Sequence, residues 1–183
     1  MPSLSLSGQA SLASLHHQEV VQTRQFLTFL LAEEMFAMAI EDIREIIEFC
    51  SLTEVPLMPS FLRGVINLRG AVVPVIDLSV RLGRAPTAVA KRTCIVILEL
   101  VQPQHTLLLG VMVDAVRAVL NVEEEKIEPP LSFGTHIRAD FIDGMINIKD
   151  RFVVALDVGA VFSVDELASL IGLAEQEGAG KHN

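Results

Sequence analysis

One segment of this chain occurs twice. Residues 64–78 read GVINLRGAVVPVIDL, and residues 144–158 read GMINIKDRFVVALDV. Aligned without a gap, the two copies share a glycine, an isoleucine, an asparagine, a valine and an aspartate at matching positions: Gly64/Gly144, Ile66/Ile146, Asn67/Asn147, Val73/Val153 and Asp77/Asp157. Each copy is an apolar run, a polar turn, a second apolar run and an aspartate, which is typical of a β-hairpin that leads into a helix N-cap.

The repeat extends beyond these hairpins. Residues 113–120, VDAVRAVL, match residues 40–47, IEDIREII, with Arg117 aligned on Arg44. The sequence therefore predicts two related halves, about 24–83 and 93–163. Residues 83–92, GRAPTAVAKR, lie between them and have the Pro, Ala and Thr content of a linker without an apolar period.

The two ends of the chain differ in composition from this repeat. Residues 1–22 are rich in Ser, Leu, Ala and Gln with no sustained period, so we expect a flexible tail. Ser163 to Glu166 form a capping box, which predicts a C-terminal helix within residues 164–183. No Lys or Arg precedes Arg24, unlike the start of a secretory signal, so a cytoplasmic protein is expected.

Several single elements are predicted from local pattern. Residues 25–31 and 35–40 read as a hairpin, and residues 41–47 as a short helical turn entering a strand, with Ile43, Ile46 and Ile47 on one side if helical. Pro74 requires an edge position or a bulge, and Asp77 should cap a short helix that ends at Gly83. Many short strands with turn signals predict a mainly β chain of two small antiparallel barrels.

Composition excludes some functions. The net charge of −9 repels phosphate backbones, and there is no Trp or Tyr to stack on bases, so nucleic acid is not an expected partner. No apolar stretch approaches the roughly 18 residues that span a bilayer, so no direct membrane insertion is expected. Because 51% of the residues are hydrophobic, some apolar surface can remain exposed for protein partners.

Catalytic and metal-binding patterns are absent from the sequence. The five histidines fall in the tails or in expected loops, and no Gly-x-Ser-x-Gly or Cys-x-x-Cys occurs. Asp77 and Asp157 could be imagined as a carboxylate pair, but a helix cap in each copy explains both. Cys50 and Cys94 are expected to be buried free thiols instead of a disulfide or a metal site. We therefore expect neither an enzyme nor a cofactor.

Four segments together are recognisable: QFLTFLLAEEMFAMAIEDIREII, VPLMPSFLRGVINLRGAVVPVIDLSVRLG, LLLGVMVDAVRAVL and FIDGMINIKDRFVVALDV. In this order they resemble the CheW family of bacterial chemotaxis coupling proteins, over about residues 24–163. The resemblance implies a CheW-like domain at residues 23–163, folded as two interlocked SH3-like five-stranded β-barrels with short helices and a C-terminal helix. It also implies no catalytic activity.

The resemblance further implies partners and contact residues. Family members bridge methyl-accepting chemoreceptors and the histidine kinase CheA, whose regulatory domain has the same fold, and other CheW-like barrels are further candidate partners. Glu45 and Arg69 match positions linked to receptor and kinase binding, and Gly64 matches a position whose side chain must stay small. The family's receptor groove lies between the barrels, which adds four weaker candidates: Ile43, Ile95, Val96 and Leu98.

Other interpretations of the exposed charges and of the fold remain open at this stage. Arg69, beside Gly70 in a tight turn, should project into solvent, where it is either a contact residue or a solvated turn arginine. Glu45 is either a contact residue or an exposed charge of little energetic weight, and Asn67 is expected to bind local backbone. The same adaptor role in a twitching-motility or other CheA-type pathway is an alternative, and a barrel that binds a small ligand in the cleft between its halves is another.

Overall fold

A computed structural model describes residues 20–101, 103, 106–130 and 137–163. Within these residues the chain is mainly β, with two short α-helices, α2 (Leu78–Arg81) and α3 (Val158–Val161). It also has 3-10 turns at Ile40–Asp42, Glu124–Lys126 and Ala139–Phe141. The strands are β1 (Thr23–Leu31), β2 (Glu34–Ala39), β3 (Ile43–Glu48), β4 (Leu62–Leu68), β5 (Ala71–Asp77), β6 (Cys94–Val101), β7 (Thr106–Val113), β8 (Ala115–Glu123), β9 (Ile127–Glu128), β10 (Ile142–Ile148) and β11 (Arg151–Leu156).

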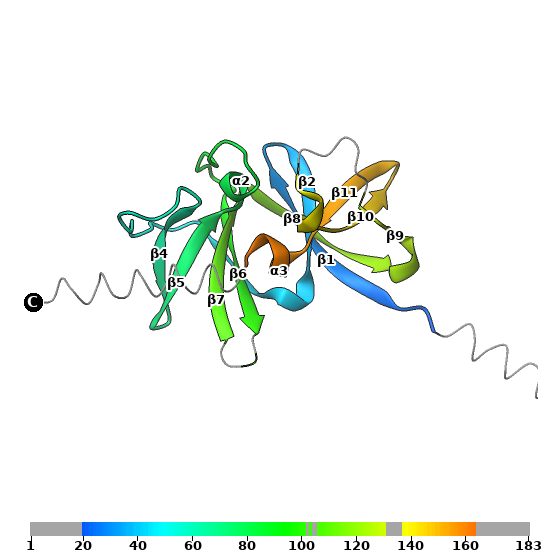
Figure 1. Cartoon of the computed structure of the whole chain (residues 1–183), viewed down its shortest axis with the longest axis horizontal. Helices are drawn as coiled ribbons and strands as arrows, with labels where there is room; N and C mark the ends of the chain where they lie inside the picture. The colour runs from blue at the N-terminus through cyan, green and yellow to red at the C-terminus, as the bar shows by residue number, and fades with distance from the viewer. Residues whose placement is uncertain (1–19, 102, 104–105, 131–136, 164–183) are drawn as a thin grey trace, which may run out of the picture.

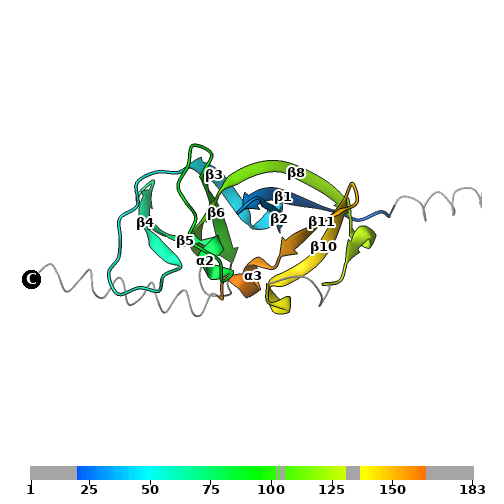
Figure 2. The same ribbon diagram turned by 90° about the horizontal axis from the view of Figure 1, so that it is seen from above.

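These strands form two curled, incompletely closed sheets that lie side by side (Figures 1 and 2). The first barrel has the order β8-β1-β2-β11-β10-β9, and the second barrel has the order β3-β6-β7-β5-β4. The predicted fold class, mainly β with two barrel-like units, is confirmed. The expected five strands hold for the second barrel, whereas the first gains a sixth because the short β9 pairs with β10.

Each barrel draws strands from both halves of the sequence. Under the repeat, β1 and β2 correspond to β6 and β7. The β1–β2 hairpin pairs with β8 and β11 from the second half, and the β6–β7 hairpin pairs with β3 and β5 from the first. The two halves have therefore exchanged their C-terminal parts, which is how the barrels interlock.

The largest apolar cluster lies between the barrels, with a smaller one inside each barrel. Alternate residues of β6 pack into different clusters. Val96 and Leu98 face the inter-barrel core, while Ile95 and Ile97 face the interior of the second barrel. A strand with two buried faces needs apolar residues throughout. The unbroken run from Cys94 to Leu98 is explained by these two cores.

The two-residue turns predicted for the repeated hairpins are present, and the first hairpin, for which three residues were left between the strands, also turns on two because β2 begins at Glu34. Both residues of each turn have positive φ, the conformation that matches the right-handed twist of the paired strands. The turns and their φ values are Ala32 (48°) and Glu33 (69°), Arg69 (51°) and Gly70 (88°), and Lys149 (49°) and Asp150 (64°). The Asn67 Oδ1 accepts a hydrogen bond from the Gly70 backbone N–H at 2.9 Å, which confirms the structural interpretation of Asn67.

The helical turn predicted for residues 41–47 is shorter than expected. Only Ile40–Asp42 forms a 3-10 turn, and β3 begins at Ile43 and pairs with β6. Ile46 and Ile47 consequently point to opposite faces, and Ile46 is 43% exposed. Pairing with an apolar strand outweighs the local helical spacing of these residues.

Pro74 lies in an interior strand, whereas an edge position or a bulge was predicted. On one side β5 pairs with β4, where Val65 lies opposite Pro74, and on the other side its pairing with β7 begins only at Val75. A register shift does occur in this hairpin, but it falls in β4 between Leu62 and Gly64. Pro74 is tolerated because β7 does not yet pair at that point.

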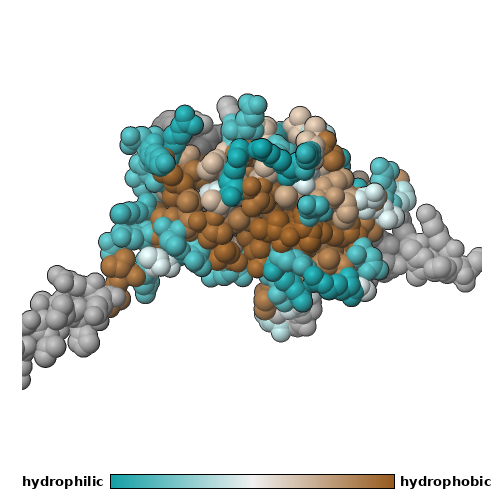
Figure 3. Space-filling model, turned by 180° about the vertical axis from the view of Figure 1, so that it is seen from behind, coloured by the Kyte–Doolittle hydropathy of each residue, from teal (hydrophilic) through white to brown (hydrophobic). Residues whose placement is uncertain are grey.

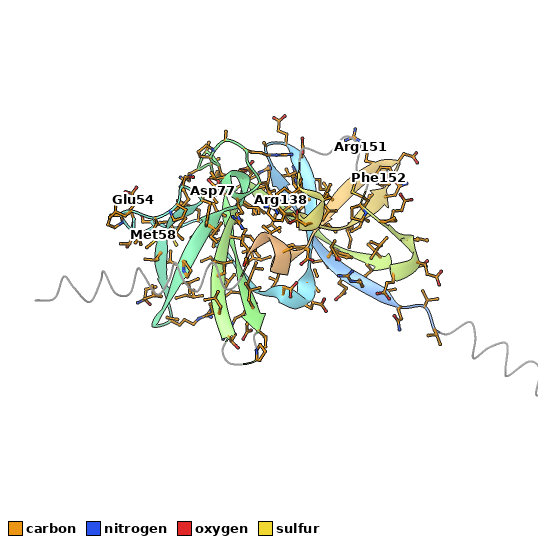
Figure 4. The ribbon with its side chains drawn as sticks, viewed as in Figure 1. Glu54, Met58, Asp77, Arg138, Arg151 and Phe152 are labelled. Carbon is orange, nitrogen blue, oxygen red and sulfur yellow. The ribbon has the colours of Figure 1, made fainter. Side chains whose placement is uncertain are left out.

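Asp77 caps α2, as predicted, and also holds the segment between the halves. Its buried carboxylate accepts hydrogen bonds from the Ser79 N–H at 3.1 Å, the Thr87 N–H at 2.9 Å and the Thr87 hydroxyl at 3.0 Å, and it pairs with Arg63 at 2.9 Å. Thr87 is 6% exposed. The linker-like segment 83–92 is therefore attached to the body of the protein at Thr87, and Figure 4 shows Asp77 beside α2.

The predicted tail at residues 1–22 lies outside the described residues except for its last three, and the predicted C-terminal helix lies wholly outside them. Among the described residues, no helix has the length and apolarity needed to cross a membrane.

Candidate interaction site

Arg69 and Glu45, expected separately as contact residues, form one ion pair. Arg69 lies in the β4–β5 turn and Glu45 on β3, and two parallel hydrogen bonds of 2.9 Å join Nη1 to Oε1 and Nη2 to Oε2. The arginine side chain is 73% exposed and the glutamate 22%. The predicted projection of Arg69 into solvent is confirmed, and its paired, planar guanidinium is presented at the surface.

This ion pair spans the opening of the second barrel. The strands β3 and β4 are the two edges of that sheet, so the β4–β5 turn reaches across to the opposite edge strand to pair with Glu45. An exposed ion pair contributes only roughly 0.2–1 kcal/mol. The pair therefore positions two charges at the barrel rim while contributing little to the stability of the fold.

The other copy of the repeat lacks this arrangement. Lys149 occupies the turn position of Arg69, and Ala118 occupies the position of Glu45. Lys149 has nearly the same backbone conformation as Arg69, with φ of 49° against 51°. The two barrels therefore have similar backbones at these turns but carry the bidentate pair at one rim only.

A second surface feature is an apolar strip where the inter-barrel core reaches solvent. We call it the inter-barrel strip; it consists of Ile43 and Ile46 on β3 and Val116 and Val119 on β8. Ile43 and Val116 pack against the inter-barrel core, while Ile46 is 43% and Val119 48% exposed. Under the repeat the strip is two matching pairs, Ile43 with Val116 and Ile46 with Val119.

Strand register places the exposed members of the strip beside that core. Ile46 lies opposite Val96 in the β3–β6 pair, and Val119 lies opposite Leu27 in the β1–β8 pair. Both partners belong to the inter-barrel cluster. β3 and β8 run along the same side of the molecule in Figure 2, and Figure 3, which shows the face behind that of Figure 1, has a wide apolar area across its middle.

Three of the weaker sequence candidates are core residues. Ile95, Val96 and Leu98 are each 0% exposed, because β6 lies in the interior of its sheet between β3 and β7. The space between the barrels is filled by packed side chains at this depth, so these residues cannot meet a partner without unfolding. Ile43 is partly exposed and stays a candidate. Val116 and Val119 were missed by sequence reasoning, although their alignment with Ile43 and Ile46 was visible in the repeat.

Gly64 must stay small for a reason internal to the chain. A Cβ at this position would lie 2.6 Å from the Thr53 carbonyl oxygen, where residue 53 forms an isolated bridge with Val65. Gly144, its match in the repeat, packs equally closely on β9 through Ile127. A larger side chain at Gly64 would displace the backbone at Thr53. A Gly64→Lys variant would therefore destabilise the fold, and its loss of binding would not show that Gly64 contacts a partner.

The two cysteines are free but not buried. Cys50 is exposed and Cys94 is partly exposed. The prediction of buried thiols was wrong because the apolar run at Cys50 ends with β3, where the chain leaves the sheet, and Cys94 is the first residue of β6. Among the described residues there is no group of His, Cys, Asp and Glu side chains that could hold a metal ion.

One carboxylate near the 3-10 turn has a shifted pKa. Partial burial raises the pKa of Asp42 above its usual value of 3.8, and the nearby charges of Glu41 and Asp157 act in the same direction. Arg24 opposes the shift, but its guanidinium already pairs with Asp143 at 3.0 Å. The charged form of Asp42 is therefore less favourable in the folded protein than in the unfolded chain.

A surface cavity of about 1070 Å³ lies on the first barrel. Its lining includes Met35 and Phe152, which are 39% and 47% exposed, and the cations Arg117, Lys149 and Arg151. Figure 4 shows Arg151 and Phe152 at the outer end of β11. The ligand-binding alternative placed a metabolite in the inter-barrel cleft, and that space is occupied by the largest core cluster.

Comparison with known proteins identifies the family and supports the fold. The model of the CheW-like domain matches residues 25–166. The chemotaxis protein CheW of Klebsiella aerogenes is 28% identical over 93% of this chain and 99% of its own length, and that of Rhizobium meliloti is 30% identical over 78% of this chain and 90% of its own. The crystal structure of the scaffolding protein TtCheW from Thermoanaerobacter tengcongensis superposes with a TM-score of 0.70 at 33% identity, covering 82% of this chain and 94% of that one.

Proposed function

The chain belongs to the CheW-like family, and from this we propose that it is a non-enzymatic adaptor that couples methyl-accepting chemoreceptors to the histidine kinase CheA in chemotaxis arrays. Family members are scaffolding proteins and not enzymes. The observation that carries the proposal is the exposed bidentate pair of Arg69 and Glu45, which has no counterpart on the matching rim of the first barrel. Polar surface pairs of this kind fix the register and orientation of protein docking.

The inter-barrel strip is the proposed receptor contact. Chemoreceptor tips are helical hairpins, and a helix docks by laying its apolar side chains into an apolar groove. Ile46 and Val119 offer exposed branched side chains on either side of the inter-barrel core. Ile43 and Val116, which pack against that core, would form the floor of the contact.

The rim of the second barrel is the proposed kinase contact. Val72, which is 70% exposed on β5, lies near the Arg69–Gly70 turn and adds an apolar side chain to the charged rim. A like barrel of the kinase regulatory domain would meet this rim with its own edge. Both contacts are small, so tight assembly would come from many adaptors held together in one array.

A charge-reversal series tests the role of the ion pair. We expect Arg69→Glu to weaken binding to the CheA regulatory domain or to receptor-containing membranes by at least about tenfold, which corresponds to ~1.4 kcal/mol. Its melting temperature should be almost unchanged, because an exposed pair contributes little to folding. Binding is measured by pull-down or titration and folding by circular dichroism.

The double variant Arg69→Glu, Glu45→Arg distinguishes a direct contact with the partner from a structural role in holding the β4–β5 turn against β3. It restores an intramolecular ion pair with the charges reversed, so binding should stay weak if the partner contacts these charged side chains directly. Recovery of full binding would show that the pair only holds the turn against β3. Lys149→Glu is the matched control, because it reverses a charge at the same turn position of the other repeat, and it should bind both partners as the wild type does. Unchanged binding of Arg69→Glu to both partners would refute the proposed role.

A further inference from the structure

The two cysteines are diagonal neighbours across the start of the β3–β6 ladder. Glu48 lies opposite Cys94, and the pairing continues by one hydrogen bond of 3.2 Å from the Phe49 N–H to the Thr93 carbonyl. Cys50 is two residues beyond Glu48. Although the cysteines are far apart in the sequence, this pairing brings Cys50, just past the end of β3, near Cys94 at the start of β6.

The positions of their neighbours favour the same face of that sheet for both side chains. Phe49 packs against the cluster inside the second barrel, whereas Cys94 packs against the inter-barrel cluster. Side chains alternate between faces along an extended chain, so a chain that stays extended from Phe49 to Cys50 places Cys50 on the face of Cys94. Cys50 is exposed and Cys94 partly exposed, so a small oxidant can reach this face.

We propose that Cys50 and Cys94 form a reversible intramolecular disulfide when the protein meets a hydroperoxide. Diagonal neighbours have Cα atoms about 7–8 Å apart, while a disulfide requires about 4.4–6.8 Å. The backbone must therefore close by up to roughly 3.6 Å. Such a shift is feasible here because β3 ends at Glu48 and residues 49–52 are outside any strand.

The oxidation balances with one hydroperoxide for two thiols. The thiolate of Cys50, the more exposed residue, attacks the peroxide oxygen, forms a sulfenic acid and releases an alcohol, or water from hydrogen peroxide. The Cys94 thiol then attacks the sulfenyl sulfur, forms the S–S bond and releases water. The two sulfurs lose two electrons in total and the O–O bond gains them, and a dithiol reductant reverses the change.

The proposed bond would act on the second barrel. It would join the end of β3 to the start of β6 and pull on residues 51–53, whose Thr53 carbonyl forms the bridge beside Gly64. The bond would thereby couple the oxidation state of the protein to the segment that closes the sheet next to β4. This inference does not depend on the adaptor role.

The test is a peptide map of the full chain after treatment with equimolar hydrogen peroxide and alkylation of the remaining thiols. We expect the intact mass to fall by two hydrogen atoms, and digestion by trypsin to give residues 45–63 linked to residues 93–117. Reduction with dithiothreitol should separate these peptides and restore both thiols. The map needs neither receptor nor kinase, so its failure would leave the adaptor proposal untouched.

Single variants complete the test. Cys50→Ser and Cys94→Ser should each yield no linked peptide under the same treatment, while the melting temperature of the reduced protein stays near that of the wild type. The proposal is overturned if the wild type remains fully alkylated at both cysteines after peroxide. It is equally overturned if its disulfides join separate molecules, as dimers on a non-reducing gel would show.

Discussion

At the scale of single residues, matching positions of the repeat have diverged in what they contact. Asp77 and Asp157 both cap a short helix, yet Asp77 is buried in a network with Arg63 and Thr87, while Asp157 is exposed and its carboxylate accepts from the Ala160 N–H. The cap itself was predictable, because it depends on one residue and its neighbours in the chain. The network was not, because Thr87 reaches Asp77 only once the chain has folded back.

Asp42 gives a prediction at this scale. Its pKa is raised in the folded protein, so stability is highest when the carboxyl is protonated and falls as the pH rises above 3.8 towards the raised value. Asp42→Asn should therefore increase the melting temperature at neutral pH, and the gain should shrink on acidification below 3.8. Asp140→Asn is the control and should not stabilise, because it breaks the Arg138 ion pair and Asp140 is not among the charges that act on Asp42. A neutral-pH melting temperature of Asp42→Asn at or below that of the wild type would contradict this account.

At the scale of elements, the local sequence pattern predicted the hairpins and helix caps correctly. It did not predict which strands would lie at the edges of the sheets or where their pairing would begin. The two-residue turns at Arg69 and Lys149 and the helices after Asp77 and Asp157 follow from short-range chemistry. Pro74 and the segment from Glu41 to Ile47 were misplaced because the neighbour of a strand, and where pairing with it begins, depends on residues distant in the sequence. The assignment of Ile95, Val96 and Leu98 to a groove failed for the same reason.

The two capping aspartates provide the prediction at the scale of elements. Asp157→Ala should cost about 1 kcal/mol, the usual effect of losing an N-cap. Asp77→Ala should cost more, about 2–3 kcal/mol, because it also leaves the buried Thr87 N–H without its partner and removes the ion pair with Arg63. Chemical denaturation measures both values. Hydrogen exchange should speed up around Thr87 in the Asp77 variant only, and equal losses in the two variants would exclude a special role for the Asp77 network.

At the scale of the whole molecule, the exchange between halves is the dominant feature. A cut between residues 88 and 89 would separate β1–β5 from β6–β11. Each of the two sheets contains strands from both sides of such a cut. The largest core cluster is likewise built from both fragments. Neither fragment holds a complete barrel, so each depends on the other for its sheet.

A nicked protein tests this dependence. A protease site inserted between Ala88 and Val89, which are exposed, should be cleavable without loss of structure. The two fragments should co-elute from a sizing column with the far-ultraviolet circular dichroism of the intact chain, and they should separate only in denaturant. Fragments that part under native conditions after complete cleavage would show that the halves fold independently.

The sequence by itself determined the repeat, the mainly β class, the hairpin turns, the two helix caps and the resemblance to the CheW family. These follow from alternation, turn chemistry and motif order, which are local properties. Only the tertiary structure decided that the halves exchange strands, that Arg69 pairs with Glu45, and that the inter-barrel core surfaces at Ile46 and Val119. The reason is physical: two matching halves offer the same backbone hydrogen bonds and similar apolar faces to either partner, so no local pattern specifies which edge a strand will join.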